Sequence, residues 1–128
     1  MNNYVIDASA LLALINEESG SEKVKVYLAN ACMSVINVSE TAAVLHNLIG
    51  FTIEEIESLV HKLIKSVIPF EISDAYQTAF LRKSTKNNGL SFGDRACLAL
   101  AKQKNLPVIT ADKMWAQLNI GVEIILVR

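Results

Sequence analysis

The chain has little cysteine, proline or glycine, with two, two and five residues among 128. Cys32 and Cys97 form no CxxC pair and have no histidine nearby in the sequence, which argues against a zinc or disulfide framework and indicates buried thiols in a reducing compartment. The sequence also lacks a repeat, a low-complexity tract and a Pro/Gly-rich linker. With 52% hydrophobic residues, we therefore expect one domain over residues 1–128 that buries roughly two-thirds of its chain surface.

Long hydrophobic runs are absent too. No apolar run approaches the roughly 18 residues of a membrane span, so we expect no membrane insertion. The first four residues carry no positive side chain and Asp7 interrupts the first apolar stretch, which argues against a secretory signal. We expect a cytoplasmic protein.

Charge of one sign is also missing, because 12 Lys and Arg oppose 13 Asp and Glu for a net charge of −1. This balance argues against a protein that coats nucleic acid through an overall positive field, so any such contact must be local. The one basic cluster is the segment 82–86, and Arg95 and Lys113 each follow an acid directly. A solvated helix end, where cations suit the helix dipole, is the ordinary explanation of that cluster.

Short apolar segments alternate with helical patterns along the whole chain. Strands are predicted at Tyr4–Ile6, Met33–Ile36, Val67–Phe70, Val108–Thr110 and Val122–Val127. Pro69 favours an edge or a strand end for the third of them. Helices are predicted at Ala8–Ile15, Ser21–Ala29, from the cap Asn37 to about Leu48, after Thr52, from about Ser73 to Asn88, and from Ser91 to before Pro107. This alternation predicts an α/β fold with a parallel sheet.

Four acids occupy related places in this pattern. Asp7 and Asp112 directly follow apolar segments, as residues do at the carboxyl edge of an open sheet, whereas Glu40 and Asp94 lie where helices open. Each acid alone has an ordinary structural explanation: Asp7 and Asp112 as helix caps, and Glu40 and Asp94 as the third residue of capping boxes opened by Asn37 and Ser91.

Together, the four acids indicate a metal site. Independent caps need not gather at one edge of a sheet, whereas a hard cation needs oxygen ligands that converge. Carboxylates about 4–6 Å apart repel by roughly 3–4 kcal/mol per pair at an effective dielectric near 20, so either some protonate or a cation binds. Because no His or Cys is nearby, we expect Mg²⁺ or Mn²⁺ rather than zinc.

The chain resembles a PIN domain, and most closely the VapC-type toxins of bacterial toxin–antitoxin pairs. The resemblance rests on four motifs and covers essentially the whole chain: residues 5–12 (VIDASALL), Ser39-Glu40, residues 90–101 (LSFGDRACLALA) and residues 106–112 (LPVITAD). It implies a three-layer α/β/α fold with a central, mostly parallel sheet of four to five strands.

The resemblance also implies a function and partners. It implies a metal-dependent endoribonuclease whose acids are Asp7, Glu40, Asp94 and Asp112, with the hydroxyls of Ser9 and Thr110 at the same edge. Asp7 and Asp94 are expected to be central ligands, and Glu40 and Asp112 to complete the ligand set or orient water. The implied partners are RNA, a small antitoxin whose helix lies in a groove, and a second copy of the chain.

Two other classes of function stay open on the sequence. A receiver-type phosphoryl-transfer domain also has acids at strand ends, but Asp7 is followed by Ala8-Ser9 and not by a second acid. A non-catalytic RNA- or protein-binding module could hold a metal for stability alone. Metal-dependent melting without RNA cleavage would distinguish this module from a nuclease.

Overall fold

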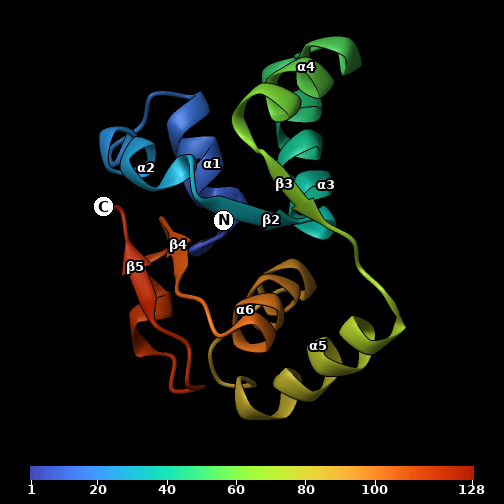
Figure 1. Ribbon diagram of the computed structural model, residues 1–128, viewed down its shortest axis with the longest axis vertical. Helices are drawn as coiled ribbons and strands as arrows, with labels where there is room; N and C mark the ends of the chain where they lie inside the picture. Colours follow the sequence, from blue (N-terminus) through green and yellow to red (C-terminus); the bar gives the residue numbers. More distant parts are fainter.

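A five-stranded parallel sheet forms the centre of the computed structural model, which describes residues 1–128 (Figure 1). The strands are β1 (Tyr4–Ile6), β2 (Ala31–Ser34), β3 (Ser66–Ile68), β4 (Val108–Thr110) and β5 (Ile124–Leu126), in the order β3-β2-β1-β4-β5. Every neighbouring pair is parallel. The predicted α/β/α architecture and parallel sheet are confirmed. The third strand lies at the edge of the sheet, but it ends at Ile68, before Pro69, and not at Phe70.

Helices cover both faces of this sheet. They are α1 (Ala8–Ile15), α2 (Ser21–Leu28), α3 (Val35–Val44), α4 (Ile53–Leu63), α5 (Ile72–Ser84) and α6 (Phe92–Lys104). In Figure 1, α1 and α2 lie on one side of the sheet and α5 and α6 on the other. Helices α3 and α4 lie at the end of the sheet that β2 and β3 form. None of these helices combines the length and apolarity that crossing a bilayer requires.

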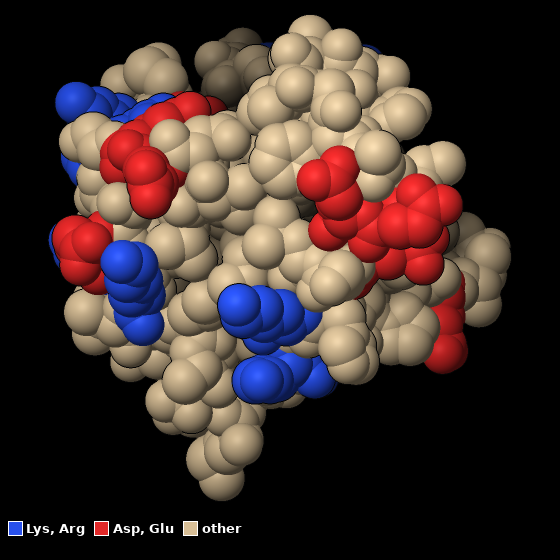
Figure 2. All heavy atoms as spheres, turned by 90° about the horizontal axis from the view of Figure 1, so that it is seen from above, with Lys and Arg blue, Asp and Glu red and all other residues tan.

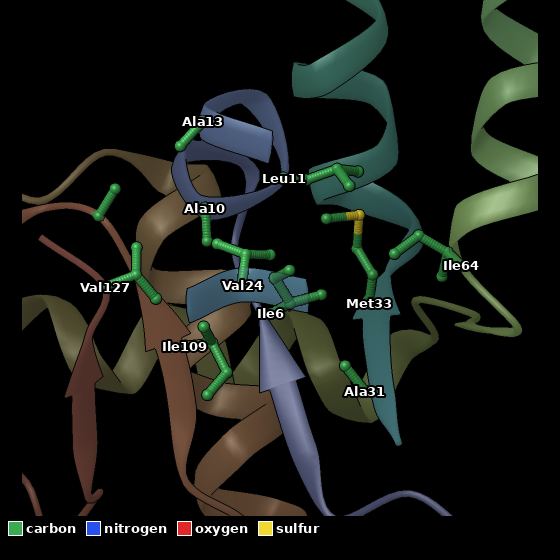
Figure 3. Close-up of a cluster of buried hydrophobic side chains, with 11 residues drawn as sticks. Ile6, Ala10, Leu11, Ala13, Val24, Ala31, Met33, Ile64, Ile109 and Val127 are labelled. Atoms are coloured by element: carbon green, nitrogen blue, oxygen red, sulfur yellow. The ribbon is translucent and has the colours of Figure 1, made fainter. Parts of the chain in front are cut away.

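The strands bury alternate side chains in two hydrophobic clusters. Ile6 and Ile109 point into the cluster beneath α1 and α2, which Figure 3 shows with Leu11, Val24 and Met33 around them. Their neighbours Val5 and Val108 point to the opposite face, in the cluster that α6 covers. Because successive side chains of a strand face opposite ways, strands of three or four residues suffice to join the two halves of the core.

One boundary prediction near the centre of the chain is wrong. The second strand ends at Ser34 and not at Ile36, and α3 begins at Val35 with Ser34 as its cap, since the Ser34 hydroxyl accepts a hydrogen bond from the Ile36 amide at 3.2 Å. Asn37 is therefore inside the helix rather than its cap. The helical path continues from α3 through a π-helical segment, η1 (Leu45–Ile49), and ends at Gly50 with φ +89°.

The bounds of other elements differ as well. The last strand is limited to Ile124–Leu126, and α5 begins one residue before Ser73 and ends at Ser84. The segment after β4 forms the short 3-10 helix η2 (Lys113–Gln117), within which Trp115 is 1% exposed. This tryptophan packs in the same hydrophobic cluster as α6 and anchors η2 to the core.

Candidate active site

The four acids predicted from the sequence line one cleft. Asp7 follows β1, Asp112 lies two residues past the end of β4, Glu40 lies in α3 and Asp94 lies in the first turn of α6. The cleft has a volume of about 210 Å³, and its other lining residues are Ala8, Ser9, Leu12 and Val44. Strands β1 and β4 are neighbours at the point where the strand order reverses, the usual ligand position in open α/β sheets.

Asp7 is held in a network of hydroxyl and amide groups. Its carboxylate accepts hydrogen bonds from the Ala10 amide at 2.9 Å, the Ser9 hydroxyl at 2.8 Å and the Thr110 hydroxyl at 2.7 Å. The two hydroxyls are oriented in turn, because the Ala111 amide donates to Ser9 Oγ at 3.0 Å and the Asp112 amide donates to Thr110 Oγ1 at 3.1 Å. Ser9 and Thr110 thus lie beside Asp7, where the sequence predicts them.

Burial changes the acidity of this carboxyl. Asp7 is 4% exposed, and this loss of solvation raises its pKa from 3.8 to about 6. The hydrogen bonds from Thr110, Ala10 and Ser9 favour the carboxylate and oppose the rise, while the charge of Asp94 adds to it. A cation in the cleft would reverse the balance by favouring the ionised form.

Glu40 is fixed by a contact between two helices. Asn37, one turn earlier on α3, is 1% exposed and donates from Nδ2 to Glu40 Oε1 at 2.7 Å and to the Gly93 carbonyl of α6 at 3.1 Å. A Cβ atom on Gly93 would overlap the Glu40 carboxylate, so only glycine allows this approach. Partial burial and the charge of Asp94 raise the pKa of Glu40, against the effect of the Asn37 hydrogen bond.

Asp94 and Asp112 also serve as helix caps. Asp94 forms a capping box with Ser91: the Asp94 amide donates to Ser91 Oγ at 3.1 Å, and the Ser91 amide donates to Asp94 Oδ2 at 3.0 Å. Asp112 Oδ1 accepts from the Met114 amide at 3.0 Å and caps η2. The capping explanation is therefore confirmed for Asp7, Asp94 and Asp112, and it is wrong for Glu40.

The donor set of the cleft suits a hard cation, although the side chains do not form a closed ligand shell. No three of the acidic, His or Cys side chains lie close enough together to hold one ion. None of the four acids forms an ion pair with Lys or Arg, and no basic side chain lines their cleft. A cleft with four carboxylates and no compensating positive charge fits a divalent ion with oxygen ligands, some of them water.

A family model identifies the chain. The model of the PIN domain matches residues 4–120. The chain belongs to the PIN-domain family. A search of curated proteins by sequence gives no match.

Solved structures share the fold of this PIN domain. DNA-bound VapBC from Salmonella typhimurium matches with a TM-score of 0.74 and 17% identity over 100% of both chains. A toxin–antitoxin complex from Klebsiella pneumoniae matches with a TM-score of 0.75 and 18% identity over 98% of both chains. Mycobacterium tuberculosis VapC20, a sarcin-ricin loop cleaving toxin, matches with a TM-score of 0.71 and 16% identity, covering 94% of this chain and 98% of VapC20.

Positive charge lies beside the acid cleft of this PIN domain rather than within it. A neighbouring hollow shares Ser9 and Asp112 with the cleft and adds Lys113 and Arg128. The face seen in Figure 2 carries small, separate groups of acidic and basic side chains on a largely uncharged surface, in keeping with the net charge of −1. On this face, positive charge is therefore confined to small groups.

Sequence reasoning missed Asn37 and Gly93. Asn37 lies one turn before Glu40, and this spacing imitates a capping box although Ser34 is the cap of α3. Gly93 sits in a helix where glycine is unfavourable, which is a sign of a close approach. Asn47, two turns after Glu40, lines a separate groove between α3 and α4.

Proposed function

We propose that this PIN domain is a metal-dependent endoribonuclease that hydrolyses phosphodiester bonds of RNA at the cleft of Asp7, Glu40, Asp94 and Asp112. One observation carries the proposal: four carboxylates from four elements line one cleft that holds no basic side chain. The likeness in fold to VapC20, a sarcin-ricin loop cleaving toxin, supports RNA as the substrate class.

The chain's own residues supply position and charge. Ser9, Thr110 and the Ala10 amide fix both oxygens of the Asp7 carboxylate, and Asn37 fixes Glu40. Asp7 and Asp94 are the central ligands in this proposal. Glu40 and Asp112, each partly exposed, complete the ligand set or orient the attacking water.

The metal supplies the rest of the chemistry. When bound, Mg²⁺ or Mn²⁺ lowers the pKa of a water molecule and neutralises charge that develops on the phosphate. Oxygen ligands without His or Cys favour these ions over zinc. The carboxylates need not contact RNA themselves.

Cleavage of a mixed pool of single-stranded RNA and tRNA tests the proposal, with Mg²⁺, Mn²⁺ or EDTA present. Discrete cuts that need metal and are lost in Asp7→Asn and Asp94→Asn are expected. Asp74→Asn is the matched control. Asp74 is the third residue of a capping box in α5, as Asp94 is in α6, but it lies outside the cleft. Asp112→Asn with full activity would remove Asp112 from the catalytic set.

A non-catalytic module is the second candidate, and one observation favours it. Three of the acids have capping hydrogen bonds, and no three lie within range of one ion. If the protein is such a module, metal raises its melting temperature, and neither the wild type nor any variant cuts RNA.

We further propose that the protein is the toxin of a type II toxin–antitoxin pair. The toxin–antitoxin complexes of similar fold support this role. A groove of about 340 Å³ between α3 and α4 is lined by Ala42, Ala43, Ile53 and Ile56 beside Ser39, the neighbour of Glu40. An antitoxin helix with an apolar face suits this groove. Ala43→Arg is expected to abolish binding of a co-expressed antitoxin while metal-dependent cutting persists.

Self-association as a homodimer is the last part of the proposal. On α5, Ile72, Tyr76 and Phe80 follow one another at helical spacing and are 71%, 58% and 68% exposed. Such an apolar stripe favours burial against another surface. Light scattering is expected to give twice the chain mass for the wild type and the chain mass for Ile72→Glu/Phe80→Glu.

A further inference from the structure

A second, basic pocket lies between α5 and α6, outside the acid cleft. Its volume is about 150 Å³. It is lined by Arg82, Thr85, Lys86, Gly89, Leu90 and Arg95. Three of these six residues are cations and none is an acid.

Arg95 is the unusual member. It is 9% exposed, yet it forms no ion pair, and its one hydrogen bond is a long one, 3.4 Å from Nη1 to the Thr78 carbonyl. Its guanidinium lies 6.0 Å from the Phe92 ring centroid, at the outer limit of a cation–π contact. A guanidinium has five N–H donors, so most of the Arg95 donors have no partner within the protein.

The helix dipole does not account for this arrangement. Arg82 is in the last turn of α5, where a cation is favourable, but Arg95 follows Asp94 in the first turns of α6, where the dipole disfavours positive charge. The Arg95 nitrogens that have no partner in the protein are not buried, so they keep contact with solvent and can donate to an anion.

We propose that this pocket binds one backbone phosphate of the RNA that the acid cleft cuts, an inference that rests on the proposed function. Arginine matches phosphate geometry with paired N–H donors, and Arg82 and Lys86 are exposed at the rim. Asp94 and Arg95 are consecutive on α6, about 100° apart around its axis. One strand of RNA can therefore cross from the pocket to the cleft around the same end of α6.

Binding of a fluorescent single-stranded RNA of mixed sequence, measured in EDTA so that no cleavage occurs, tests the pocket. Arg82→Gln/Lys86→Gln alters two exposed residues only, and Arg95→Met keeps an apolar stem in the core. Each variant is expected to weaken RNA binding about tenfold. The slope of log K against log[salt] is expected to fall in magnitude by about 0.7, the value for one phosphate of a single strand.

Lys62→Gln/Lys65→Gln is the matched control, because it removes two exposed cations outside the pocket. Equal losses in this control, or RNA binding unchanged in both pocket variants, would overturn the proposal. The proposal would also be overturned if the wild type bound oligoglutamate and the pocket variants lost that binding but kept RNA binding, because the pocket would then serve an acidic peptide. Absence of RNA binding by the wild type would overturn it as well.

The outcome is separable from that of the proposed function. If the wild type cuts RNA with metal and the pocket variants bind RNA unchanged, only the proposal for the pocket is rejected. If RNA binding depends on the pocket but the protein cuts no RNA with any metal, the nuclease proposal is rejected and RNA binding at the pocket stands.

Discussion

Asp7 is a carboxyl that the fold buries among hydroxyls, and its altered acidity predicts a pH dependence of stability. Its folded pKa of about 6 exceeds the ordinary 3.8, so between these values the folded state holds a proton that the unfolded state has released. Stability therefore falls as pH rises through this window, by about 3 kcal/mol for a shift of this size in the metal-free protein. Above about pH 6 the full penalty is present.

Asp7→Asn removes this penalty while keeping the shape of the side chain. In EDTA, the free energy of unfolding of Asp7→Asn is expected to gain on that of the wild type between pH 4 and pH 7.5, by up to about 3 kcal/mol. Urea unfolding at both pH values measures the change, and other titrating groups cancel in the comparison. A difference between the two proteins that is the same at pH 4 and pH 7.5 would contradict the raised pKa.

Gly93 gives a second test on a single residue. In Gly93→Ala the new methyl displaces the Glu40 carboxylate from Asn37, while alanine improves the helix by about 0.5–1 kcal/mol. RNA cleavage is expected to fall about tenfold to hundredfold with stability retained. Glu40→Ala provides the control: if the methyl acts through Glu40, adding Gly93→Ala to that variant changes cleavage no further.

Among the secondary-structure elements, α6 separates the capping role of an acid from its role in the cleft. Ser91→Ala removes the hydroxyl that caps the Asp94 amide and is expected to lower stability by about 1 kcal/mol. Cleavage is expected to stay within a few-fold of the wild type, because the Asp94 carboxylate still accepts from the Ser91 amide. Thermal unfolding and RNA cleavage, measured on the same preparations, would reveal a shared loss if the cap itself positioned Asp94.

The elements predicted from sequence hold where a local signal marks their ends. The helix predicted at Ala8–Ile15 has these bounds in the structure, and Ser91 with Asp94 marks the start of α6. Asn37 misled because its spacing to Glu40 imitates a capping box, whereas Ser34 caps the helix and the Asn37 side chain reaches α6. That contact lies between residues 56 positions apart, so no local pattern could announce it.

For the molecule as a whole, the fold followed from the alternation of elements and the acid cleft from the geometry of parallel sheets. Asp7 and Asp112 follow two strands of one parallel sheet, so their common edge could be predicted. The basic pocket beside the cleft could not be predicted. Arg95 stands out only because it is 9% exposed and forms no ion pair, and the sequence shows neither property. Burial and partners depend on how α5 packs on α6.

Metal binding is expected to stabilise the whole molecule, because four acids share a cleft that no Lys or Arg side chain lines. An ion that binds only the folded state at 100 times its Kd adds about 2.7 kcal/mol, which raises Tm by roughly 10 °C for a chain of this size. Mg²⁺ or Mn²⁺ is expected to raise Tm in the wild type and in Asp74→Asn, but not in Asp7→Asn/Asp94→Asn. An equal shift in all three would place the ion outside the cleft.

The same experiment at pH 5 links the metal to the acidity of Asp7. With a pKa of about 6 in the metal-free protein, Asp7 is mostly protonated at pH 5, and a metal must displace that proton to bind. The rise in Tm at a fixed metal concentration is therefore expected to be smaller at pH 5 than at pH 7.5. A rise of the same size at both pH values would mean that Asp7 is not a ligand, since its protonation would then not compete with the ion.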